Sequence, residues 1–308
     1  MNINKIVTKQ TCSVEFLTGI IDYAGFFPPA RLDYIIAFEN FLEYSKSDHS
    51  WMLSRFISPT SKIKELKKYL KEKSIDSDMS IVAILQPADD INKYIQQLAS
   101  QLKEIDSLPK HVSVSSIETK VPKNISPANI DILLEVLRKE LSSIPYQRIF
   151  IEVSTDECMQ FDVNNFVDRV GIKVRCGGPS IDLVPSVESL AKTIMYIADN
   201  KIPVKYTAGL HHPILHFDPT LGGLVHGFLN VFMASMLAYS NRSNYSLIES
   251  VLSDQDPSNF IFDKHSAGYK DKRIHVEDIQ HIRQTYAHSF GTCSFDDPIM
   301  DLTSLGII

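Results

Sequence analysis

The sequence predicts an α/β protein, and the expected architecture is a (β/α)8 barrel of the TIM type. Short runs rich in β-branched residues alternate with longer stretches of helical period, which is the pattern of βα units around a parallel sheet. Each connection is also long enough to hold a crossover helix. Eight units of this kind close most simply as a barrel. An open doubly wound parallel sheet is the alternative, because periodicity does not reveal closure.

Six segments have the composition of buried strands, and two near the C-terminus are weaker, so the last two barrel strands are expected to be irregular. The six are Trp51–Ile57, Met79–Leu85, His111–Ile117, Arg148–Val153, Gly171–Arg175 and Pro203–Thr207. The weaker two are Phe260–Phe262 and a segment near Phe290–Phe295. Helical periodicity predicts the helices Leu32–Tyr44, Ser61–Lys73, Asp89–Ile105, Pro127–Leu141, Val187–Asn200, Leu224–Tyr239 and His275–Tyr286.

The segment 1–50 precedes the first predicted strand and is expected to form an N-terminal cap or lid, with the barrel spanning 51–308. It contains Asp22–Ala30, an aromatic and proline-rich stretch that would close over the mouth of the barrel. No internal repeat, low-complexity run or Gly/Ser linker divides the chain. We therefore treat 1–308 as a single domain.

Composition indicates a folded protein without a large basic surface. Of the 308 residues, 44% are hydrophobic and 22% charged, both near globular averages, and the formal net charge is −6. That balance argues against nucleic acid and against an anionic membrane as partners. The cysteines lack CxxC spacing, and neither a signal peptide nor a membrane span is visible, so a cytoplasmic location is expected. Whether the chain forms a homo-oligomer stays open.

Alternation along three consecutive strands predicts that charged side chains face the barrel interior. The aliphatic residues of Arg148–Val153 form one row and leave Glu152 on the other. The same logic sets Lys173 with Arg175 on the next strand and Lys205 with Thr207 on the one after.

Three cations facing one carboxylate would be an unbalanced interior, since burying an unpaired charge costs several kcal/mol. An anionic substrate would explain the imbalance. The alternative is that these side chains sit at exposed strand ends or pair with acids from elsewhere, such as Asp22, Asp182 or Asp263.

Gly177 and Gly178 follow Arg175 where the chain leaves the C-terminal end of its strand, which is where barrel enzymes build their sites. Two glycines allow backbone N–H groups to approach an anion, and Arg175 could grip a phosphate or carboxylate with two parallel hydrogen bonds. The alternative is a tight turn without a ligand.

Four histidines fall within sixteen residues, namely His211, His212, His216 and His226. Imidazoles at the end of a strand can transfer protons or bind a divalent metal, with His211, His212 and His226 as the alternative metal ligands. Asn230 lies four residues after His226 on a predicted helix, so the two could share a face toward the site. Alternatively they are a buried histidine and amide that satisfy each other. Without an HExxH signature, no metal cofactor is the first expectation.

The chain resembles a bacterial family of uncharacterised cytosolic proteins along nearly its whole length. The motifs that carry this resemblance are DYAGxFPPA, KVRxGG, KxTAGLHHP, HGFxN and FGxCSFxxPxxDL, which begin here at Asp22, Lys173, Lys205, His226 and Phe290. A weaker similarity is to class I aldolases of the deoxyribose-phosphate type. Their strands KTSTG and KASGG resemble the segments starting at Lys205 and Lys173, although the order along the chain is reversed.

These observations predict a lyase of aldolase type in which Lys205 forms an imine with a small anionic carbonyl substrate. A nearby Lys173 ammonium would lower the pKa of Lys205, Glu152 or His211 would move protons, and Arg175 with Gly177 and Gly178 would hold the anion. The other expected substrate contacts are Asp22, Thr207, His212, His226 and Asn230. Two alternatives stay open: a metal-dependent hydrolase or lyase built on His211, His212 and His226, and a non-catalytic sensor of an anionic metabolite.

Overall fold

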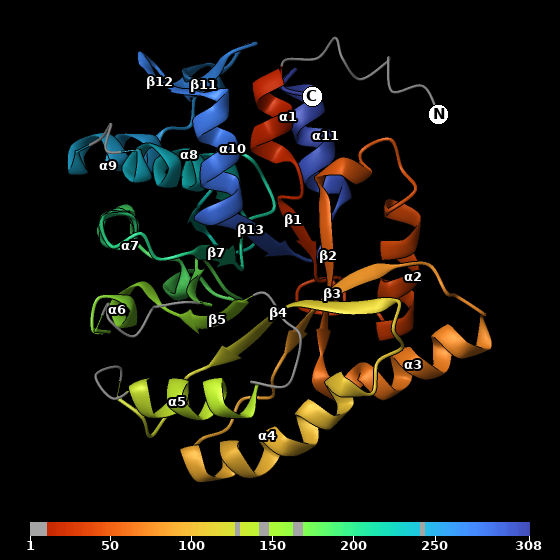
Figure 1. The fold of residues 1–308 in the computed structure, drawn as a ribbon. Helices are drawn as coiled ribbons and strands as arrows, with labels where there is room; N and C mark the ends of the chain where they lie inside the picture. Colours follow the sequence, from red (N-terminus) through yellow and green to blue (C-terminus); the bar gives the residue numbers. More distant parts are fainter. Residues whose placement is uncertain (1–10, 127–129, 142–147, 163–168, 241–243) are drawn as a thin grey trace.

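Eight parallel strands close into a barrel in the computed structural model, which describes residues 11–126, 130–141, 148–162, 169–240 and 244–308. Around the barrel the strands follow the order β1–β13–β7–β6–β5–β4–β3–β2 (Figure 1). Their bounds are β1 Ile21–Tyr23, β2 Leu53–Pro59, β3 Met79–Ile84, β4 Val112–Lys120, β5 Arg148–Val153, β6 Val170–Arg175, β7 Val204–Thr207 and β13 Ala287–Thr292. The predicted (β/α)8 barrel is confirmed, and the open sheet is wrong.

Helices surround the strands on the outside of the barrel (Figure 1). They are α1 Thr11–Leu17, α2 Tyr34–Tyr44, α3 Ile63–Glu72, α4 Ile91–Asp106, α5 Ile130–Glu140, α6 Thr155–Cys158, α7 Val187–Asp199, α8 Phe228–Tyr239, α9 Tyr245–Ser253, α10 Val276–Thr285 and α11 Asp296–Ser304. Side-chain caps fix several starts: Asp33, Asp90 and Ser186 each accept hydrogen bonds from backbone N–H groups of the first turn. The helix predictions agree to within a few residues, because amphipathic periodicity and caps point to the same places.

Two predictions at the ends of helices need correction. The predicted helix Leu224–Tyr239 begins too early, since Gly223–Val225 is strand β9, paired with β8 at His216–Asp218, and the helix starts at Phe228. The first three residues of the predicted helix Pro127–Leu141 lie outside the described residues.

The N-terminal segment is part of the barrel rather than a cap. Ile21–Tyr23 pairs with β13 on one side and with β2 on the other, so the predicted division into a lid 1–50 and a barrel 51–308 is wrong. The strand is only three residues long and carries Asp22 at its centre, which is why it lacks the usual hydrophobic signature. Phe260–Phe262 is not a barrel strand either. It forms β10 of a small antiparallel sheet with β11 Ser266–Tyr269 and β12 Lys272–His275.

Barrel strands bury aliphatic residues toward the helices and turn a polar row inward. Ile149, Ile151 and Val153 of β5 are buried, and the register aligns Glu152 of β5 with Lys173 of β6 and Lys173 with Lys205 of β7. Parallel strands bring these inward residues close together, so the polar row becomes a polar centre in the barrel.

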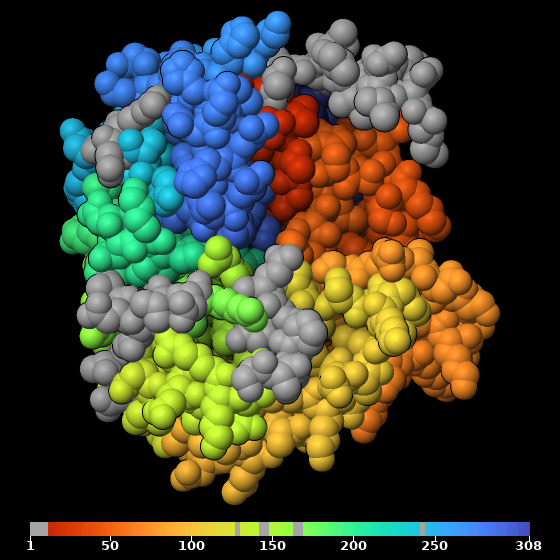
Figure 2. Space-filling model, viewed as in Figure 1, coloured from red at the N-terminus to blue at the C-terminus, as the bar shows by residue number. Residues whose placement is uncertain are grey.

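The N-terminal helix α1 packs against α10, far along the chain, and the two lie side by side at the surface (Figure 2). Their contact closes the outer layer next to strand β1. Among the described helices none is both long and apolar enough to cross a membrane, and the most apolar one, α8, has 12 residues.

Gly171 of β6 makes close packing inside the barrel possible. A Cβ atom added there would lie 2.5 Å from the carbonyl oxygen of Pro203 and 2.7 Å from the ring of Phe150. The neighbouring strand cannot move without disturbing the barrel register. We expect Gly171→Ala to lower the free energy of unfolding by about 1–3 kcal/mol through overpacking. Urea denaturation would measure this, and an unchanged midpoint would contradict the packing described.

Candidate functional site

A chain of buried ion pairs fills the centre of the barrel. Lys205 Nζ donates to Asp22 Oδ2 and to Glu118 Oε1, both at 2.6 Å, and Lys173 Nζ donates to Glu118 Oε2 at 2.6 Å. Glu118 therefore bridges two ammonium groups with its two oxygens. None of the four side chains is more than 4% exposed, so the low local dielectric strengthens these contacts.

The network continues to the C-terminal end of the barrel. Glu152 receives Lys173 Nζ at 3.3 Å, Arg175 Nη1 at 2.8 Å and Lys120 Nζ at 3.1 Å. Arg175 and Lys120 are the last residues of β6 and β4, and their side chains are 30% and 51% exposed. Solvent and ligands therefore meet the network at this end, which we call the C-terminal mouth.

The predicted shortage of negative charge is wrong for this network, because Asp22 and Glu118 join Glu152. Lys205 pairs with Asp22, as in the alternative stated from the sequence. Glu118 was missed because the expected strand ended at Ile117, three residues before the observed end at Lys120. Alternation continued past Ile117 would have put Glu118 and Lys120 in the inward row.

The ion pairs favour the charged forms of Glu152, Asp22 and Lys173. Burial alone would raise the pKa of Glu152, but the Lys173 and Lys120 ammonium groups outweigh it and lower the pKa to about 2. The pKa of Asp22 is also lowered, because Lys205 and Arg55 outweigh burial. For Lys173, burial opposes the charge, but the carboxylates of Glu118 and Glu152 raise its pKa. Lys173 therefore does not face Lys205 as an uncompensated charge, contrary to the prediction.

The loops after β6 and β7 pack backbone against backbone beside Arg175. A Cβ atom on Gly177 would lie 3.1 Å from the Cα of Gly209, and one on Gly178 would lie 2.6 Å from a methyl of Leu183. Arg175 Nη2 donates to the carbonyl oxygen of Gly177 at 3.3 Å, which ties the guanidinium to the loop. Close packing thus explains both glycines, and the predicted anion contact with their N–H groups stays a prediction. Thr207 ends β7 beside this loop and accepts from the N–H of Cys176 through its carbonyl oxygen.

His211 lies at the C-terminal mouth, above the end of β13. Its Nδ1 is 3.4 Å from Thr292 Oγ1 and 3.9 Å from Asp297 Oδ2, and its Nε2 is 3.9 Å from Cys293 Sγ. Burial lowers the pKa of His211, so the ring is neutral at pH 7 and able to accept a proton.

Of the other histidines, His212 and His216 pack ring against ring with centroids 4.4 Å apart, and both are near enough to His211 to act on it electrostatically. His212 Nδ1 is 2.6 Å from Asp301 Oδ2, and His226 Nε2 donates to the carbonyl oxygen of Pro185 at 2.8 Å. His226 precedes helix α8 instead of lying on it, so the expected shared face with Asn230 is wrong. Within the part of the chain that the structure describes, no three His, Cys, Asp or Glu side chains form a group that could hold a metal ion. The metal alternative therefore stays a prediction without a ligand set.

Asn230 is a structural amide. It accepts from the N–H of Leu215 at 2.9 Å and donates to the carbonyl oxygens of Val251 and Asp254 at 2.7 and 2.8 Å. These bonds join the loop before β8, helix α8 and the end of α9. They account for Asn230 without any ligand. Its partners are backbone groups and not His226, so the alternative in which the two side chains satisfy each other is also wrong.

Comparison with known proteins found no matching family model, no matching curated protein and no matching solved structure. The resemblances stated from sequence motifs therefore stay predictions, and the functional argument rests on the site itself.

Replacing Asn230 tests its structural role. We expect Asn230→Ala to lower the free energy of unfolding by about 2–4 kcal/mol, because three buried backbone groups lose their partner. Chemical denaturation would measure the change. An Asn230→Ala protein of unchanged stability that fails to bind substrate would instead place Asn230 in the site.

Acid is expected to weaken the fold in a defined range of pH. Depressed carboxyl pKa values stabilise the folded state above the unfolded pKa of about 4, and this stabilisation is lost as the pH falls toward the folded value. For Glu152 the folded value is about 2. Urea denaturation between these limits should give a shallower pH dependence for Glu152→Gln than for the wild type. An equal pH dependence of the free energy of unfolding in both proteins would show that the pKa of Glu152 is not lowered by its ion pairs.

Proposed function

We propose that the protein is a lyase of aldolase type in which Lys205 forms an imine with a small anionic carbonyl compound. The observation that carries the proposal is the position of the Lys205 amine, which contacts two carboxylates inside a barrel and shares one of them with a second lysine. Imine chemistry needs an amine with proton-accepting groups at hydrogen-bond distance, and this arrangement supplies them.

Asp22 and Glu118 can serve each proton transfer at the amine. One carboxylate takes a proton from the Lys205 ammonium, and the neutral amine then adds to the carbonyl carbon to give a carbinolamine. The carbinolamine oxygen receives protons and leaves as water, which yields a protonated imine. Both carboxylate oxygens lie 2.6 Å from Nζ, so no proton has to travel far.

The carboxylates oppose loss of the ammonium proton but also support the product. A protonated imine carries the same positive charge at the same nitrogen, so its ion pairs with Asp22 and Glu118 persist. The favourable ion pairs with Asp22 and Glu118 are therefore lost only while Lys205 is a neutral amine. Electrostatic stabilisation by fixed groups that match the charge of the intermediate is the usual source of rate acceleration.

During carbon–carbon cleavage a second base must take the proton of the β-hydroxyl group, whose carbon becomes the carbonyl of the released fragment. The electron pair of the broken bond passes to the protonated imine and gives an enamine. His211 suits the role of this base, because burial keeps its imidazole neutral and it lies at the C-terminal mouth. Glu152 contacts Lys173 and Arg175, while Lys205 contacts Asp22 and Glu118, so we assign Glu152 to orienting Lys173 and Arg175. Arg175 and Lys120 are partly exposed there and are suited to bind the phosphate or carboxylate of the substrate.

Borohydride trapping tests the imine. Incubation with 2-keto acids or sugar phosphates and then borohydride should reduce the C=N bond to a stable amine. The mass gain equals the carbonyl compound minus water plus two hydrogens. Peptide mapping of the wild-type adduct should place it on Lys205, Lys205→Met should abolish it, and Lys192→Met, at an exposed helix position, should leave it unchanged.

Three results would contradict the proposal. One is the absence of any adduct across the panel, and another is an adduct on a different lysine. The third is a compound that stabilises the protein against heat without trapping or turnover, which would favour the non-catalytic sensor.

A further inference from the structure

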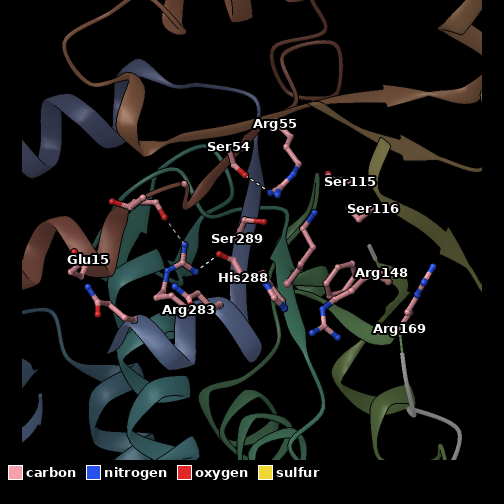
Figure 3. A pocket seen from close by; sticks show the side chains of 16 residues that line it. Glu15, Ser54, Arg55, Ser115, Ser116, Arg148, Arg169, Arg283, His288 and Ser289 are labelled. Atoms are coloured by element: carbon pink, nitrogen blue, oxygen red, sulfur yellow. Dashed lines mark hydrogen bonds between the residues drawn. The ribbon is translucent and has the colours of Figure 1, made fainter. Parts of the chain in front are cut away.

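A second hollow lies at the opposite end of the barrel, where the strands begin. It is a cavity of about 540 Å³, and we call it the N-terminal cavity (Figure 3). Arg148 is the first residue of β5, Arg169 directly precedes β6, and Arg55 and His288 lie near the starts of β2 and β13. Because the strands are parallel, these positions meet at one end. Arg283, near the end of helix α10, completes the wall.

Positive charge dominates this cavity. Four arginines and the Lys205 side chain line it, and the one acidic residue among the lining residues is Glu15 on α1. In Figure 3, Arg283 and Arg169 stand at opposite sides, with Arg55, Arg148 and His288 between them. No salt bridge joins Arg55, Arg148 or Arg283 to a carboxylate among the residues that the structure describes, in contrast to the paired network above them.

Arg283 is held in place by the backbone. Its guanidinium donates to the carbonyl oxygens of Ala287 and His288, and to that of Thr18 at 3.0 Å. These bonds join the end of α10, strand β13 and the turn before β1. Its charge is therefore a fixed feature of the wall, and it cannot swing into solvent to reduce the repulsion.

Buried polar atoms around the cavity lack partners. Nε of Arg55, Nε of Arg283 and Nε2 of His288 are shielded from solvent and have no hydrogen bond among the described residues. Arg55 Nη1 donates to the Ser54 hydroxyl at 2.6 Å. Leaving a buried donor unpaired is unfavourable, and more so for a charged group. Oxygen atoms of a bound anion would satisfy such donors.

The protonation of His288 reflects the same excess of positive charge. Burial and the nearby guanidinium groups of Arg148 and Arg283 lower the pKa of His288 to about 3. The ring is therefore neutral at pH 7, with one donor and one acceptor nitrogen.

We infer that the N-terminal cavity binds the phosphate group of a small molecule. Guanidinium forks match phosphate oxygens with paired hydrogen bonds, and several arginines together favour a dianion over a single carboxylate. Ser54 and Ser116 add hydroxyl groups to the lining. The volume lies within the range of small-molecule sites and exceeds what inorganic phosphate alone would fill.

This cavity lies away from the C-terminal mouth, where Arg175 and His211 are, but it shares Lys205 with the proposed imine chemistry. Lys205 and Ser289 line the N-terminal cavity from above, and both contact Asp22. A phosphate bound there would face the same Asp22–Lys205 pair from below. The structure thus places an anion site where it can act on the central network without occupying the C-terminal mouth.

Titration calorimetry with pyrophosphate and with inorganic phosphate tests the inference. We expect saturable binding of pyrophosphate that weakens at least tenfold in Arg55→Gln and in Arg148→Gln. Lys68→Gln, which removes an equal charge from the exposed surface of α3, should bind as the wild type does. Thermal melts verify that each variant folds. If either Arg55→Gln or Arg148→Gln fails to fold, the other variant still tests the inference.

Arg175→Gln separates this site from the C-terminal mouth. If pyrophosphate also binds at the C-terminal mouth, Arg175→Gln should abolish binding there and leave binding at the N-terminal cavity. Dependence of the remaining binding on Arg55 and Arg148 would support the inference. Binding that is lost in Arg175→Gln alone and kept in folded Arg55→Gln and Arg148→Gln would overturn the inference. So would the absence of saturable binding to the wild type, whatever the outcome of borohydride trapping.

Discussion

The bridge that Glu118 makes between Lys173 and Lys205 is the interaction on which the centre of the barrel depends. Burying an ammonium group costs several kcal/mol, and the barrel buries two of them on neighbouring strands. One carboxylate with an oxygen for each lysine, aided by Asp22 and Glu152 at either side, compensates that cost. Without it, two like charges would lie close together in a region of low dielectric, and the strands could not keep their register.

Charge is distributed unevenly along the barrel axis. The central network pairs its cations with carboxylates, and toward the C-terminal mouth Arg175 and Lys120 share Glu152. The N-terminal cavity instead gathers Arg55, Arg148 and Arg283, and among the described residues no carboxylate forms a salt bridge with any of these three. This excess of positive charge involves other residues than those of the predicted shortage, which the pairing of Lys173 and Lys205 with Asp22, Glu118 and Glu152 contradicts.

Alternation along single strands was enough to predict the inward row of the site. Glu152, Lys173, Arg175 and Lys205 converge as expected, because a two-residue period needs no knowledge of tertiary structure. Glu118 was missed because the predicted strand ended three residues too early, at Ile117 instead of Lys120, and strand boundaries are the weakest part of such reasoning. The place of Asp22 in the barrel could not be seen, because a three-residue strand with a central acid has no hydrophobic signature and is defined by its two neighbours. The N-terminal cavity gathers residues from strand starts, a turn and helix α10, and no local pattern links them.

The central claim is that one carboxylate holds two buried lysine ammonium groups. Nitrogen-15 NMR of the lysine side chains tests it most directly, since buried, hydrogen-bonded ammonium groups exchange slowly with water and give separate signals. The account predicts two such signals in the wild type, both of which shift or vanish in Glu118→Gln. Two protected signals that are unchanged in a folded Glu118→Gln protein would contradict it.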